Sequence, residues 1–205
     1  MLLNFPGQVI GAFYIPAFTL SAGEIVMVKL PSGPFFRSTI RSFVDTYQSP
    51  GYEHIHSSVP FRHVTYRTKR KFPHYFPLTV GGYCQQHGKP EHTLLQEMYT
   101  RTHLQPRTRL STLTSNDEKL LSLFTTLMET NKLFFDLDGV NAMQGAEIFH
   151  TMRHHVGQTG AAVFFDFCDE FLQQCTRSVL AGYTGKLPVE EAAQLSAAAF
   201  IPAVE

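Results

Sequence analysis

The sequence has no excess of either charge, since 17 lysine and arginine residues balance 17 aspartate and glutamate residues over 205 positions. No overall field therefore draws the chain to nucleic acid or to an anionic membrane, and we expect no nucleic-acid partner. Cysteine is also scarce. Cys84, Cys168 and Cys175 are widely spaced and form no C-x-x-C pair, which argues against a disulfide framework or a zinc knuckle and predicts small buried thiols in a reducing compartment.

The N-terminal segment lacks the features of a targeting or membrane-spanning segment. Residues 1–18 have no basic start, and Pro6, Gly7, Gly11 and Pro16 interrupt their apolar run. We therefore expect a cytoplasmic protein that is not an integral membrane protein.

The sequence does contain short apolar runs that alternate with amphipathic segments. Strands are predicted in QVIGAFYI, EIVMVKL, VTYRT, KLFFD, AAVFFDF and SVLAGY. Helices are predicted in STIRSFVDTY, EHTLLQEMYTRTHL, GAEIFHTMRHHV and DEFLQQC, and a capping box of Ser115 and Glu118 predicts another helix that starts near residue 116. Strands separated by helices imply crossover connections, so we predict an α/β fold with a largely parallel sheet. We expect one domain over residues 1–187 and a weakly helical tail over 188–205.

The order of these segments resembles the ATP-binding subunit of ABC transporters over roughly residues 8 to 185. FTLSAGEIVMVKLPSG is similar to the lead into the Walker A loop, and HYFPLTVGGY to the segment after the Q-loop. LTSNDEKLLSLFTTLMETNKLFFDLDG resembles the signature sequence, its helix and Walker B, and residues 145–179 resemble the stretch from the D-loop onward. The resemblance implies a P-loop NTPase-like sheet with flanking helices, antiparallel N-terminal strands and a reduced helical subdomain.

The loop that would bind phosphate departs from that family's pattern. Without a gap, the lysine position falls on Phe36; with one extra residue it falls on Arg37, and the magnesium-binding serine position falls on Ser38. Pro34 removes a backbone donor from a loop whose N–H groups should point at the phosphates. The resemblance therefore implies only a vestigial nucleotide site, made of Gly33, Arg37, Ser38, Thr39 and Asp136.

The other catalytic motifs of the family are altered as well. Asp136 matches the magnesium-associated carboxylate, but Leu137 replaces the general-base glutamate beside it and cannot accept a proton. The remaining replacements are Cys168 for the switch histidine, Ser115 and Asn116 for the signature glycines, and Met143 for the D-loop aspartate. We expect a degenerate ATPase with no catalytic residues and no cofactor, which acts as an interaction or regulatory module.

A basic loop is the predicted partner-binding surface. Arg67, Lys69, Arg70 and Lys71 fall in the region that faces the membrane subunit in the resembled family. We expect a protein partner, either a membrane transporter subunit or an active ABC ATPase. The alternative is a divergent ATP-binding protein that binds or hydrolyses ATP with magnesium through Arg37, Ser38 and Asp136, together with a partner subunit.

Three weaker patterns remain as further alternatives. FFDLDGV is similar to the nucleophile motif of haloacid-dehalogenase phosphatases, with Asp136 and Asp138 as its two carboxylates. His150 and His154 have the i, i+4 spacing of zinc ligands, but no third ligand is evident. Tyr14 stands where an aromatic side chain stacks on adenine in the resembled family, although a strand tyrosine is more often simple packing.

Overall fold

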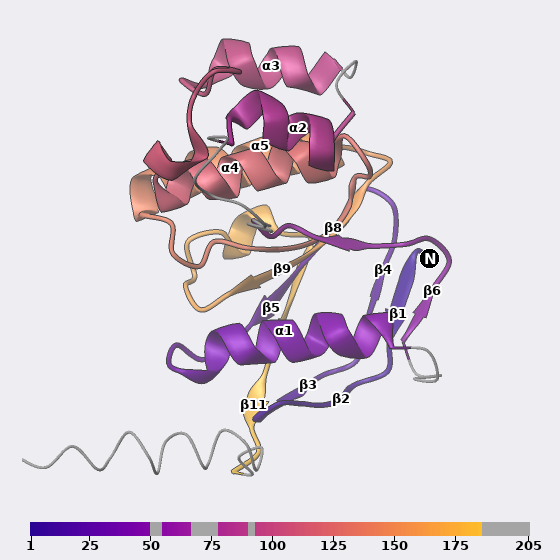
Figure 1. The fold of residues 1–205 in the computed structure, drawn as a ribbon. Helices are drawn as coiled ribbons and strands as arrows, with labels where there is room; N and C mark the ends of the chain where they lie inside the picture. The colour runs from indigo at the N-terminus through magenta and orange to yellow at the C-terminus, as the bar shows by residue number, and fades with distance from the viewer. Residues whose placement is uncertain (50–54, 67–77, 90–92, 186–205) are drawn as a thin grey trace, which may run out of the picture.

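The computed structural model describes residues 1–49, 55–66, 78–89 and 93–185, and its centre is a five-stranded parallel sheet (Figure 1). The strand order is β10-β5-β9-β8-β7, and every pairing within it is parallel. The strands are β5 (Ile25–Lys29), β7 (Arg62–His63), β8 (Lys132–Asp136), β9 (Ala161–Asp166) and β10 (Arg177–Leu180). The predicted parallel α/β fold is confirmed.

The carboxyl ends of the central strands lie side by side. Lys29 at the end of β5 is paired with Asp166 at the end of β9, and Asp136 at the end of β8 is paired with Phe165. Open parallel sheets place their ligand crevices at this edge.

Antiparallel strands form the N-terminal part of the fold, again as predicted. One small sheet has the order β4-β1-β6 and the other the order β11-β3-β2. The strands are β1 (Leu3–Phe5), β2 (Gln8–Ile10), β3 (Phe13–Ile15), β4 (Phe18–Leu20), β6 (His56–Ser57) and β11 (Gly182–Tyr183). The predicted single strand QVIGAFYI is in fact a hairpin of β2 and β3, because Gly11 adopts a left-handed φ of 58° and turns the chain.

Helices cover both faces of the parallel sheet. The helices are α1 (Phe35–Gln48), α2 (Val80–His87), α3 (Thr93–Arg101), α4 (Ser115–Leu127) and α5 (Ala142–Val156). Figure 1 shows α1 on one face, α4 and α5 on the other, and α2 and α3 outside α4. Alternate residues of β8 therefore face different cores: Phe134 packs with α1 and the N-terminal strands, whereas Phe135 packs with α4 and α5.

Several element boundaries differ from the predictions. The capping box of α4 consists of Thr114 and Asp117, one residue earlier than predicted, because the Thr114 backbone N–H donates to the Asp117 carboxylate at 2.9 Å and the Thr114 hydroxyl accepts from the Asp117 backbone N–H. DEFLQQC contains only a 3₁₀ turn over Leu172–Gln174. SVLAGY divides at Ala181 because its two halves pair with different sheets.

Two further predictions concern strand position and chain organisation. The strand predicted in VTYRT lies earlier, at β7, where Arg62 and His63 pair with β8. The predicted boundary at residue 187 and the tail over 188–205 fall outside the described residues and stay predictions. Within the described part of the chain, every helix is too short or too polar to span a bilayer.

Candidate functional site

The candidate site is a cavity of about 570 Å³ at the carboxyl edge of the sheet. Its walls come from α1, the end of β7, the first half of α4 and the loop after β8. Asp136, Asp138, Arg37, His63 and Lys119 contribute charged or titratable groups to these walls. The cavity therefore joins segments that are far apart in sequence at the edge where the fold predicts a ligand site.

Asp136 is the most buried charged group in this cavity, at 7% exposure. Its Oδ1 atom accepts from Lys119 Nζ at 2.7 Å and from the backbone N–H of Asp138 at 3.0 Å, and its Oδ2 atom lies 3.3 Å from His63 Nε2. Burial alone would raise the pKa of Asp136, but the charge of Lys119 and the hydrogen bond from His63 outweigh it and hold that pKa well below its usual range. Both oxygens are thus occupied by groups of the chain itself.

Lys119 lies in the second turn of α4, and its side chain is also largely withdrawn from solvent. Its side-chain exposure is 12%, against 9% for the side chain of Asp136. The ammonium lies 5.7 Å from the centre of the Phe135 ring, which gives it a second favourable contact. Sequence reasoning missed Lys119 because its neighbours indicate an amphipathic helix without saying which strand end the helix crosses.

Arg37 forms a second ion pair at the same edge, between its Nε atom and Asp138 Oδ2. The hydrogen bond and charge of Asp138 raise the pKa of Arg37. This pair differs from the first in its environment, because the Arg37 side chain is 73% exposed. Of the five predicted nucleotide-site residues, Arg37 and Asp136 line the same cavity.

The other three predicted residues do not line the cavity. The Ser38 hydroxyl donates to the Phe35 carbonyl of its own helix at 3.1 Å. Thr39 is 1% exposed and lies beneath the Gly11 turn, and its hydroxyl has no hydrogen-bond partner among the described residues. Gly33 is exposed, with a φ of 138°. Ser38 and Thr39 are thus directed into local packing.

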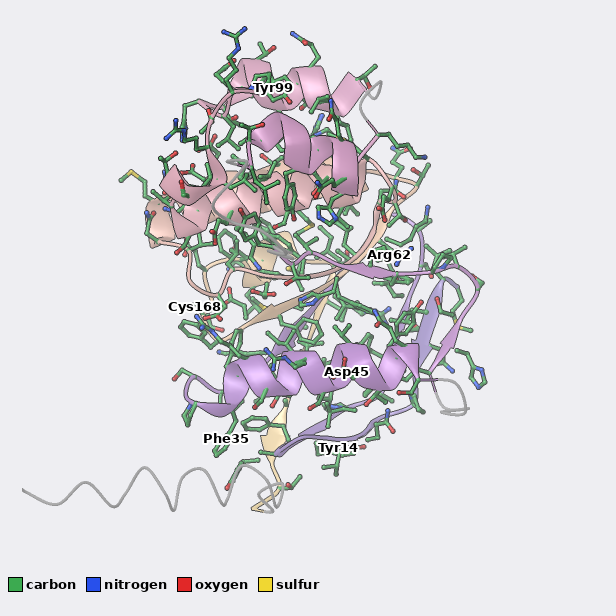
Figure 2. All side chains as sticks on the ribbon, viewed as in Figure 1. Tyr14, Phe35, Asp45, Arg62, Tyr99 and Cys168 are labelled. Atoms are coloured by element: carbon green, nitrogen blue, oxygen red, sulfur yellow. The ribbon has the colours of Figure 1, made fainter. Side chains whose placement is uncertain are left out.

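Aromatic rings occupy the start of α1, where the resembled family binds phosphate. Pro34 precedes the helix and supplies no side-chain cap. Phe36 is 5% exposed, and its ring meets that of Phe167, which directly follows β9, edge-on at 5.5 Å between centroids. Figure 2 labels Phe35 at this end of α1 and Cys168 on the nearby loop after β9. The contact between the rings of Phe36 and Phe167 therefore joins the start of α1 to the end of β9.

The start of α4 is also occupied by side chains of the chain itself. Asn116 donates through Nδ2 to Gln144 Oε1 and accepts from the Asn141 backbone N–H at 3.1 Å. His103 Nε2 lies 2.9 Å from Asp117, the capping residue. These contacts join the first turns of α4 and α5, so Asn116, which is predicted to replace one signature glycine, holds the starts of two helices together.

The remaining predicted sites have these positions. His150 and His154 belong to no group of three metal-binding side chains within the described ranges. Tyr14 is 46% exposed on the outer side of β3, opposite Val9 of β2. The basic residues Arg67, Lys69, Arg70 and Lys71 lie outside the described residues.

The three cysteines are free thiols, as predicted, but they are not all buried. Cys84 is buried and Cys175 is partly buried, and burial raises the pKa of Cys84 to about 11 and that of Cys175 to about 12. The prediction is wrong for Cys168, which is exposed because it lies in the loop beyond the end of β9.

Comparison with solved structures identifies ATP-binding subunits of ABC transporters as structural neighbours. A Pyrococcus furiosus protein described as an ABC transporter ATP-binding protein superposes with a TM-score of 0.66 at 13% identity, over 88% of this chain and 97% of that one. An ATP-binding subunit of an ABC transporter gives 0.62 at 11% identity, over 96% and 100%. A nucleotide-free ATP-binding cassette from an ABC transporter gives 0.58 at 11% identity, over 95% of both chains.

The fold is ABC ATPase-like. Neither a family model nor a curated protein matches the chain by sequence. At these identities the likeness establishes the fold, and the chemistry must be argued from the side chains at the cavity.

Proposed function

We propose that this chain is a non-catalytic ABC ATPase-like protein, a pseudo-ATPase that serves as an interaction or regulatory module of a transporter-type complex. One observation carries the proposal: Asp136, the carboxylate that would associate with magnesium, is already neutralised by Lys119 at 2.7 Å and contacted by His63 at 3.3 Å. A magnesium ion at the Asp136 carboxylate would have to displace the buried Lys119 ammonium. The two positive charges of the ion would then lie beside that ammonium.

The residues present do not fit magnesium-ATP. The phosphates would need backbone donors and a free cation at the start of α1, where Pro34 lacks an N–H and Phe36 is buried. Arg37 is the cation in the first turn of α1, but it is paired with Asp138. Among the described residues, this edge also carries the carboxylates Asp136, Asp138, Asp166, Asp169 and Glu170, and Lys29 is paired with Asp169. These carboxylates disfavour a polyphosphate beside them.

The start of α4 supports a role that does not depend on nucleotide. In ABC ATPases each signature helix completes the nucleotide site of the other subunit, which requires free donors at the start of that helix. Here Thr114 and Asp117 cap the helix and Asn116 is bonded to Gln144. We therefore propose that the chain neither hydrolyses ATP nor completes a neighbour's site.

A constitutive protein partner follows from this proposal. The structural neighbours are described as parts of ABC transporters, which favours a membrane transporter subunit or an active ABC ATPase as the partner and a cytoplasmic location. We propose that Arg67, Lys69, Arg70 and Lys71 contact an acidic patch on that partner. Such charged contacts set orientation and association rate and weaken as salt increases.

Calorimetric titration of the full chain with magnesium-ATP tests the nucleotide part of the proposal. We expect no saturable heat up to millimolar ATP, because Pro34 removes a backbone donor at the start of α1 and Arg37, the cation in that turn, is paired with Asp138. Saturable binding that is lost in Asp136→Asn would contradict the proposal. Affinity purification with and without alanine at the four basic positions tests the partner surface, and an unchanged yield of co-purified proteins would contradict it.

A second candidate is a divergent ATP-binding protein whose partner supplies the missing groups. It is favoured by one observation, that Arg37 and Asp136 line the same cavity. This candidate predicts that adding the partner to the calorimetric titration produces ATP binding. The phosphatase alternative is tested separately by hydrolysis of an aryl phosphate, which the buried pairing of Asp136 with Lys119 opposes.

A further inference from the structure

We infer that Lys119 is a built-in counter-ion of Asp136. This ion pair holds the layer of helices α2, α3 and α4, called the α2–α4 layer, on the parallel sheet without any ligand. The inference deepens the proposed function, on which it rests, because it gives a reason for the site to be independent of nucleotide. It also assigns Lys119 a positioning role that the sequence pattern did not indicate.

The geometry of the pair is the first support. Lys119 Nζ and Asp136 Oδ1 are 2.7 Å apart, with side-chain exposures of 12% and 9%. An ion pair withdrawn from water is favourable only when the remaining hydrogen-bonding positions are filled. Here the Asp138 backbone N–H and His63 Nε2 supply further contacts to the carboxylate. The pair thus has the surroundings that a persistent buried ion pair requires.

The position of the pair in the fold is the second support. Lys119 belongs to α4, whereas Asp136 ends β8, so the contact connects a helix to the carboxyl edge of the sheet. Phe124 of α4 forms a separate apolar cluster with Val80 of α2 and Met98 of α3. Helices α2 and α3 therefore follow α4, and a contact that fixes α4 fixes the orientation of the whole layer.

A second connection acts at the same end of α4. Asn116 accepts from the Asn141 backbone N–H and donates to Gln144, which joins the start of α4 to the start of α5. On the other side of the cavity, Arg37 of α1 pairs with Asp138. Residues 136–141 thus contact three helices, α1, α4 and α5. Of these contacts, the one between Lys119 and Asp136 is buried.

The test is hydrogen exchange, followed by mass spectrometry, on the full chain and three variants. Lys119→Met removes the charge and keeps an unbranched side chain. Lys119→Met with Asp136→Asn also removes the bare carboxylate, and Lys132→Met removes a lysine on β8 whose contact is with Asn131. We expect amides of α4 to exchange at least about tenfold faster in Lys119→Met, which corresponds to about 1.4 kcal/mol of opening free energy. The double variant should recover part of the protection, and Lys132→Met should match the wild type.

Two outcomes overturn the inference. One is that α4 exchanges at the same rate in Lys119→Met and Lys132→Met, which would make the ion pair incidental. The other is that manganese at millimolar concentration slows α4 exchange in the wild type but not in Asp136→Asn, since a metal ion would then be the counter-ion. If Lys119→Met does not fold, the double variant and Asp136→Asn alone carry the test, because both lack a bare carboxylate, and both must exchange faster than the wild type in α4.

These outcomes are distinguishable from those that test the proposed function. ATP binding by the wild type, with the effect of Lys119→Met intact, contradicts the proposed function alone. Unchanged α4 exchange in Lys119→Met, with no ATP binding, contradicts only the counter-ion inference.

Discussion

Two ion pairs join helices to the same loop, but they differ in their burial. The Lys119–Asp136 pair connects α4 to the end of β8, with side-chain exposures of 12% and 9%. The Arg37–Asp138 pair connects α1 to the loop after β8, with side-chain exposures of 73% and 27%. Breaking a buried pair leaves a charge without water, while breaking an exposed pair returns both charges to water. Burial, more than the presence of a contact, therefore decides which of the two pairs stabilises the fold.

The largest expected effect is that of Lys119→Met. Because this change leaves the Asp136 carboxylate buried and without its counter-ion, we expect the free energy of unfolding to fall by about 3–5 kcal/mol. Urea denaturation measures it, and Lys132→Met is the matched control, with an expected change within about 0.5 kcal/mol. A loss below about 1 kcal/mol for Lys119→Met would contradict this expectation, because the buried pair would then stabilise the fold no more than the exposed pair does.

The next effect is the coupling between the two partners. Asp136→Asn in the Lys119→Met background removes the unpaired carboxylate, so the double variant should be less destabilised than the sum of the two single variants. We expect a coupling free energy of about 0.5–3 kcal/mol from a double-mutant cycle in urea. Additive single effects would show that the two side chains contribute to stability separately.

A third, smaller effect concerns a pair of intermediate burial, Glu97 of α3 and His155 of α5, at 3.2 Å. Burial lowers the pKa of His155 from 6.5, although Glu97 opposes this shift. The unfolded chain therefore protonates His155 more readily than the folded chain does. The contribution of neutral His155 to the free energy of unfolding is full above pH 6.5, and it is lost as the pH falls toward the folded-state pKa. We expect the loss between pH 7.5 and pH 5.5 to be smaller in His155→Gln, as measured by urea denaturation. Equal losses in both proteins would contradict it.

The smallest expected effect is that of Arg37→Ala. Since the Arg37 side chain is largely exposed, its pair with Asp138 should contribute no more than about 1 kcal/mol, and added salt should reduce that further. Thermal unfolding at low and high ionic strength measures both. A salt-independent loss as large as that of Lys119→Met would show that the exposed pair is the stronger connection.

The strands of the parallel core were predictable because local sequence patterns indicate them. KLFFD and AAVFFDF are continuous apolar runs, which is typical of strands buried on both faces, and they form β8 and β9. The hairpin of β2 and β3 was missed, although Gly11 carried the signal for a turn. β7 was misplaced because a strand of two residues leaves almost no periodicity to detect.

The candidate site was predictable only in part. Asp136 follows a buried strand, so its place at the carboxyl edge could be inferred, and Arg37 follows the turn after β5. Lys119 and His63 could not be inferred, because their contacts depend on how α4 crosses the end of β8 and on how β7 pairs beside β8. Ser38 and Thr39 point elsewhere because α1 begins at Phe35, before both residues, and fixes their directions.

The central claim, that Asp136 is satisfied within the chain and has no need of nucleotide, is tested most directly by thermal unfolding with and without magnesium-ATP. A ligand that binds the native state raises its stability, by about 2.7 kcal/mol at 100 times its dissociation constant. We predict no change in the melting temperature of the wild type at millimolar magnesium-ATP. A saturable rise in the wild type that disappears in Asp136→Asn would contradict the account.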